Sequence, residues 1–181
     1  MTQLLETAEG EPESRPSLVD RVTSYRGSAP EDIPIMEAAV WRRIEAFIGR
    51  RWTPRPITFT VEGPGPWIPP VAPFAIDTAE RWDAASRMWI VATAEPAPLG
   101  FDLSADVWRL SGTAGDGAFM PAEVAEAAMR LFEYSRGIAE NHWHEGALVE
   151  GVAYKWTARA LELSGAADLL RPYRRLGARA A

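Results

Sequence analysis

The sequence predicts a mainly α-helical protein, a small bundle of about four helices with a Pro- and Trp-rich β-hairpin insert between the second and third helices. Two stretches, one after Asp32 and one after Pro121, carry apolar residues at helical spacing. Between them, residues 52–117 are rich in Pro, Gly, Trp and residues that favour strands. A chain of 181 residues predicts one main domain, which we place at residues 17–163.

The composition excludes several classes of site. There is no cysteine, so disulfides, thiolate zinc sites and cysteine nucleophiles are ruled out. No apolar run approaches the roughly 18–20 residues that cross a bilayer, and the N-terminus lacks the pattern of a signal peptide. We therefore expect a cytoplasmic protein with no membrane partner. The net charge of −6 argues against bulk attraction to nucleic acid.

The N-terminal part of the chain predicts an arm followed by two helices. Residues 1–16 are polar and acidic, which predicts a disordered N-terminal arm. Ser17, with Asp20 three residues later, is an N-cap for a short helix that reaches Tyr25. Asp32 is a second N-cap, and the helix after it should end near Gly49. Its apolar face consists of Met36, Val40, Ile44, Phe47 and Ile48.

The insert, at about residues 52–117, predicts a small antiparallel sheet or a set of hairpins. Residues 57–61 alternate between apolar and polar, and residues 88–93 and 107–112 are two further strand candidates. Pro- and Gly-rich segments separate these runs. Prolines at this density favour loops and sheet edges over a central strand.

The C-terminal part predicts two more helices and a tail. Pro121 opens the longest helix, at the favoured first position, and the helix should end between residues 139 and 141. A last full helix runs from Tyr154 to Leu163, and Ser164-Gly165 breaks it. Residues 164–181, which we call the docking tail, carry an apolar pair that leads directly into an aromatic residue and several arginines. Such a chain end either packs on its own domain or contacts a partner.

One cluster of residues resembles a metal site. His142 and His144 alternate in a loop, with Glu140 and Glu145 nearby. No HExxH pattern is present, no Gly-rich segment matches a phosphate-binding loop, and no GxSxG motif marks a nucleophile. A surface loop accounts for these residues better, so we assign no catalytic, cofactor-binding or metal-binding residue. The alternative left open is a small cytoplasmic metal-binding protein or enzyme that uses the His142/His144 loop.

The chain has eight tryptophans, a high number for its length. Tryptophan and arginine anchor many protein interfaces, so some of these residues could be buried between subunits. Filling the core of a small domain would explain them equally well. The candidates for a subunit interface are Trp52, Trp67, Trp89 and Trp108.

Three segments together resemble a known family. They are Ile44 to Trp52 (IEAFIGRRW), Val107 to Gly115 (VWRLSGTAG) and Leu163 to Arg175 (LSGAADLLRPYRR). With the helix order around them, they resemble the head–tail connector, or adaptor, family of long-tailed bacteriophages and gene transfer agents. The resemblance covers roughly residues 17–177, and the C-terminal segment carries most of its weight.

The resemblance implies a virion structural protein rather than an enzyme. Members of the family form a ring, usually a dodecamer, under the portal protein in the neck of the particle, and are assembled in the host cytoplasm. The ring extends the DNA channel without sequence-specific binding of DNA and contacts the next tail component, such as a stopper. The resemblance places the docking tail at the portal. Its apolar anchors would be Leu169, Leu170 and Tyr173, and its cations Arg171, Arg174 and Arg175.

Overall fold

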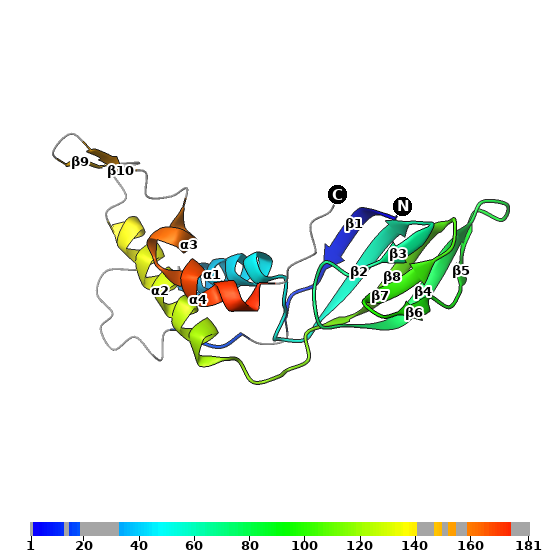
Figure 1. The fold of residues 1–181 in the computed structure, drawn as a ribbon, viewed down its shortest axis with the longest axis horizontal. Helices are drawn as coiled ribbons and strands as arrows, with labels where there is room; N and C mark the ends of the chain where they lie inside the picture. The colour runs from blue at the N-terminus through cyan, green and yellow to red at the C-terminus, as the bar shows by residue number, and fades with distance from the viewer. Residues whose placement is uncertain are drawn as a thin grey trace. The chain divides into compact units, whose positions relative to one another are not determined.

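The computed structural model describes residues 2–12, 15–18, 33–140, 147–149, 152–154 and 159–174. The chain divides into two compact units (Figure 1). The described residues of the first, which we call the β unit, are 2–12 and 49–119. The second, the helical unit, contains the described residues between 15 and 48 and between 120 and 174.

The larger sheet of the β unit has five antiparallel strands in the order β1-β2-β8-β4-β5. Strand β8 is central, and β1 and β5 are the two edges (Figure 1). The strands are β1 (Gln3–Glu9), β2 (Arg55–Glu62), β4 (Phe74–Asp83), β5 (Met88–Val91) and β8 (Val107–Ala114).

A smaller sheet of three strands has the order β3-β7-β6. Its strands are β3 (Gly65–Trp67), β6 (Glu95–Ala97) and β7 (Gly100–Leu103). Residues on one face of β2 and β8 are buried in alternation, as expected for strands with one face on a core. Both sheets supply side chains to that core, and the rings of Phe59 and Trp67 meet edge to face at 5.2 Å.

The helical unit is built on α1 (Ile33–Ile48) and α2 (Ala122–Glu140). Short elements follow in the order β9 (Ala147–Val149), β10 (Val152–Tyr154), α3 (Ala160–Leu163), α4 (Ala166–Leu170) and a 3₁₀ turn (Arg171–Tyr173). The buried faces of α1 and α2 include Ile44, Ile48, Val124, Leu131 and Phe132. No helix in the described ranges combines the length and the apolar character needed to cross a membrane.

The prediction of a mainly α-helical bundle is wrong, because the β unit holds two sheets of five and three strands rather than one hairpin insert. The error comes from short strands that contain prolines, such as Pro66 in β3 and Pro96 in β6. Both strands are edges of the smaller sheet, where a missing backbone N–H is tolerated. Pro66 and Pro96 therefore lie in edge strands, whereas Pro64, Pro69, Pro73 and Pro98 lie between strands.

The structure also corrects both ends of the predicted domain plan. Residues 3–9, expected in a disordered arm, form β1 and pair with β2. Tyr154, expected to begin the last helix, lies in β10, and the described helix begins only at Ala160. The helices after Asp32 and Pro121 are confirmed as α1 and α2, and the three strand candidates lie at β2, β5 and β8. Most of the short helix expected from Ser17 lies outside the described residues.

Candidate functional site

The described part of the docking tail, residues 164–174, packs within the helical unit. Gly165 adopts a positive φ of 74°, which lets the chain turn between α3 and α4. Leu170 at the end of α4 is fully buried, and α4 packs against α2. Leu170 therefore belongs to the core of its own unit, while Leu169 is half-buried beside it.

In the described part of the docking tail, Tyr173 makes a hydrogen bond and Arg174 makes a cation–π contact with the helical unit. The Tyr173 hydroxyl donates to the Glu123 carboxylate at 2.9 Å. The backbone N–H of Glu123 itself, and then this hydroxyl, hold the pKa of Glu123 below its ordinary value. The same contact raises the pKa of Tyr173. The guanidinium of Arg174 lies 5.1 Å from the centre of the Phe47 ring.

Two cations of the docking tail therefore lie on a segment that packs against the helices of its own unit. Arg171 and Arg174 are exposed, and Arg171 also pairs with Asp168 at 3.0 Å. Tyr173 is half-buried. Arg175, the third predicted cation, lies outside the described residues. The described part of the tail offers two exposed arginines and two half-buried apolar side chains for contact with a partner.

The four tryptophan candidates separate into two groups. Trp52, Trp67 and Trp108 are buried in the β unit. Trp89 on edge strand β5 is half-buried, with its ring 5.3 Å from that of Trp82. The Arg109 guanidinium covers Trp89 at 4.5 Å and pairs with Glu80 at 2.7 Å. Of these four tryptophans, only Trp89 is partly exposed to solvent within its unit.

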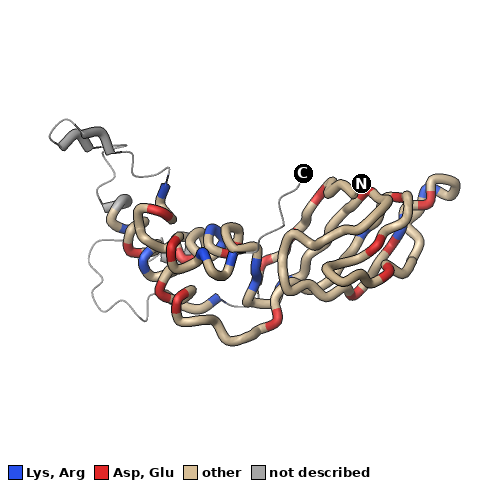
Figure 2. Tube along the Cα trace, in the orientation of Figure 1, with Lys and Arg blue, Asp and Glu red and all other residues tan. Residues whose placement is uncertain are grey.

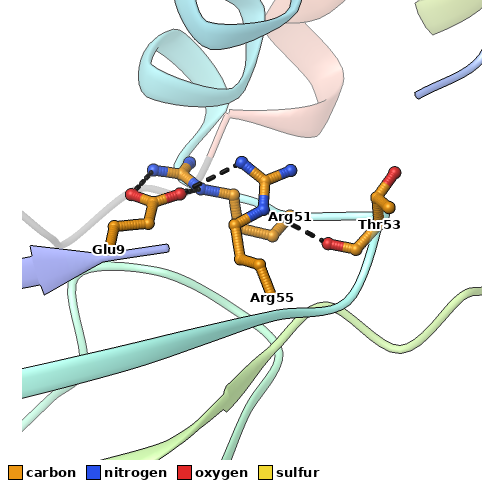
Figure 3. A network of polar contacts seen from close by, with 4 residues as sticks. All are labelled: Glu9, Arg51, Thr53 and Arg55. Atoms are coloured by element: carbon orange, nitrogen blue, oxygen red, sulfur yellow. Dashed lines mark hydrogen bonds and ion pairs between the residues drawn. The ribbon is translucent and has the colours of Figure 1, made fainter. Parts of the chain in front are cut away.

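A polar network secures the N-terminal strand of the β unit (Figure 3). Arg51 makes a two-pronged contact with the Glu9 carboxylate, from Nε at 2.7 Å and from Nη2 at 2.9 Å. Arg55 donates to the same carboxylate at 3.1 Å and to the Thr53 carbonyl oxygen at 3.3 Å. The hydrogen bond from Arg51 is the largest cause that lowers the pKa of Glu9, and both arginine charges add to it against partial burial.

Sequence reasoning missed this network and the apolar character of the sheet edges. Exposed aliphatic side chains lie on β1 and on β5. They are Leu4, Leu5, Met88, Ile90 and Val91. A pair of histidines such as His142 and His144 is easy to see in a sequence. The exposure of an aliphatic residue on a strand, in contrast, depends on whether that strand becomes an edge of the sheet.

The described residues hold no group of three or more His, Asp or Glu side chains placed to bind a metal ion. The predicted loop with His142 and His144 lies outside the described residues. Figure 2 shows basic and acidic residues interspersed along both units rather than gathered into a basic stripe.

Comparison with known proteins identifies solved chains with the same fold. A chain from the neck of an empty gene transfer agent (GTA) particle, computed with C6 symmetry, is 17% identical with a TM-score of 0.66, and 98% of each chain is covered. A chain from the virion of a native GTA particle is 16% identical with a TM-score of 0.67 and the same coverage. A third, from the neck of a native GTA particle computed with C12 symmetry, is 18% identical with a TM-score of 0.53, covering 81% of this chain and 82% of that one.

No protein-family model and no curated protein sequence matches this chain. The likeness is therefore one of fold, carried by structure at 16–18% identity. It agrees with the predicted resemblance, because chains from the GTA particle share this fold over almost their whole length.

Proposed function

We propose that this chain is a structural subunit of the neck of a phage-like particle, an adaptor that joins head to tail. The observation that carries the proposal is the fold shared with a GTA neck chain over 98% of both chains. A match of this extent includes both the β unit and the helical unit, so it does not rest on one common motif. The role is structural rather than catalytic.

In this proposal the subunit forms a ring under the portal protein, extends the DNA channel and contacts the next tail component, such as a stopper. The necks that contain similar chains were computed with C6 and C12 symmetry, which supports a cyclic arrangement of copies. The net charge of −6 and the interspersed charges suit a channel through which DNA passes without being held.

The docking tail is the part of the chain that we assign to the portal. Arg171 and Arg174 are exposed and would pair with acidic groups of the portal, with Leu169 and Tyr173 as apolar neighbours. Leu170 acts indirectly, because its burial beneath α2 holds these side chains in place.

The adaptor assignment is tested by electron microscopy of native particles and of this protein mixed with the portal encoded beside it. We expect symmetric density under the portal that the two units fit. A bare portal, together with the absence of the chain from purified particles, would reject the assignment.

The docking assignment is tested by reversing charge on the surface of the tail. The double variant Arg171→Glu/Arg174→Glu should fold normally but lose portal binding in a pull-down, because its charges then repel acidic portal groups. Arg43→Glu is a matched control on an exposed position of α1. If the double variant binds as well as the control, the portal contact lies elsewhere.

A further inference from the structure

The five-stranded sheet ends in two free edges. Within the described ranges, β1 and β5 each have a strand on one side only. Natural proteins usually protect such edges with charges, prolines or covering segments, because an open edge pairs readily with another chain. Strand β5 reads Met-Trp-Ile-Val and contains no charge, and the exposed fractions of Val91 and Met88 are 81% and 63%.

The apolar residues at the two edges lie at the same level of the sheet. The printed strand pairs connect them through one row of directly opposed residues: Leu4, Val61, Trp108, Arg81 and Ile90. Residues opposed in this way point to the same face. Leu4 and Ile90, exposed by 36% and 43%, are therefore at opposite ends of one row and on one face.

The neighbouring row lies on the other face, and it ends in the charged Glu6 on β1 and in the apolar Val91 on β5. It contains Glu6, Thr60, Arg109, Glu80 and Val91. The outermost strands also run in the same direction, because every adjacent pair between them is antiparallel and they are four strands apart. A second sheet placed beside the first at the same level would bring β5 next to β1 as a parallel pair.

We propose that β5 of one copy pairs with β1 of the next copy, so that the larger sheets of neighbouring subunits join head to tail. This inference rests on the ring in the proposed function, since a ring needs two different and complementary surfaces on every subunit. Among the described residues, the two edges satisfy that need with backbone groups that no further strand pairs and with one row that ends in an aliphatic side chain at each edge, Leu4 and Ile90. Trp89, the interface candidate that keeps exposed surface, lies on the same strand β5.

Engineered disulfides test this pairing directly, because the natural chain has no cysteine. The variant Leu4→Cys/Ile90→Cys places one thiol on each edge. Within one chain these positions are four strand spacings apart, about 19 Å, whereas a disulfide needs Cα atoms within about 7 Å. Any bond between the two positions must therefore join different copies.

We expect mild oxidation of purified particles to convert the double variant into a ladder of covalent multimers on a non-reducing gel. The variant Glu6→Cys/Val91→Cys tests the same pairing at the two ends of the neighbouring row. Each single-cysteine variant should stay monomeric, because a head-to-tail contact does not bring two identical positions together. Dimers from Ile90→Cys alone would instead indicate a symmetric contact between two β5 strands and overturn the inference.

Immunoblotting of the particles separates this inference from the proposed function. If the chain is present and neither double variant gives a ladder, the edge pairing is wrong and the neck assignment stands. If the chain is absent from particles, the neck assignment fails, and oxidation of the concentrated pure protein decides the pairing: a ladder supports it and monomers overturn it.

A lysine on the edge gives a second, independent readout. Val91→Lys should remove most of the incorporation into particles, since a lysine on a sheet edge opposes strand pairing. Leu99→Lys is the matched control, because Leu99 is 72% exposed in the turn between β6 and β7. Normal incorporation of Val91→Lys would contradict the pairing.

Discussion

Glu9 ties the first strand to two arginines that are almost buried, with 11% and 4% of the side chains of Arg51 and Arg55 exposed. Charges at that depth are tolerated when an opposite charge and well-placed hydrogen bonds accompany them. All seven residues of β1 are exposed, and Glu9 links the strand to these arginines in addition to its backbone pairing with β2.

Replacement of this carboxylate tests its contribution. Glu9→Gln should lower the free energy of unfolding by roughly 1–3 kcal/mol at pH 7, because charge-assisted hydrogen bonds are lost while both arginines stay charged. Denaturant unfolding measures the loss. Glu6→Gln, on the same strand and exposed, is the control and should change stability by less than about 0.5 kcal/mol.

The effect of this replacement should depend on pH in a defined direction. The folded-state pKa of Glu9 lies below its ordinary value of 4.5. Its contribution is therefore complete above about pH 4.5 and is lost as the pH falls through the folded pKa. The stability difference between the natural protein and Glu9→Gln should shrink in that acid range. A difference that is the same at pH 7 and pH 3 would show that the carboxylate acts through shape rather than charge.

The individual elements show what a sequence pattern can and cannot predict. Helices α1 and α2 were predictable because their apolar residues recur on one face over several turns. Strand β4 was not, because a bulge between Ile76 and Thr78 interrupts the alternation that marks a half-buried strand. Strand β1 gave no signal, since its order comes from backbone pairing and from Glu9 rather than from burial of its own side chains.

The candidate site was also only partly predictable from the sequence. The apolar and basic character of the docking tail is visible in the sequence, but the burial of Leu170 depends on its packing against α2, which lies far away in the chain. The number of tryptophans is equally compatible with a core and with an interface. Only the placement of the strands shows that Trp108 fills the core while Trp89 lies on an edge.

The central strand β8 has a position that accepts no side chain. A Cβ atom added at Gly112 would overlap the backbone carbonyl oxygen of Ala75 on β4. Gly112→Ala should therefore destabilise the protein by roughly 1–3 kcal/mol or more, because the backbone of a packed sheet must shift. Gly137→Ala on α2 is a control with open space around the new methyl group, and it should stabilise by about 0.5–1 kcal/mol. Equal thermal stability of the two variants would contradict this account of β8.

On the scale of the whole molecule, the β unit and the helical unit each contain buried apolar residues of their own. A subunit with two such units can bind a different partner through each unit. In the proposed neck, the docking tail of the helical unit would contact the portal, and the edges of the β unit would contact neighbouring copies. Local loss of stability in one unit should then leave the other unit folded.

Hydrogen exchange on paired variants tests this independence. Leu170→Ala removes a fully buried side chain and should destabilise the helical unit by roughly 2–5 kcal/mol, so exchange should rise in peptides from α1 and α2. Glu9→Gln should raise exchange in β1 and β2 and leave α2 unchanged, because its contacts lie within the β unit. The effects of the two variants should add in the double variant, as expected for sites that share no partner. If each single variant accelerates exchange in both units, the chain has one cooperative core, and a disturbance at the portal contact would then reach the contacts between neighbouring copies.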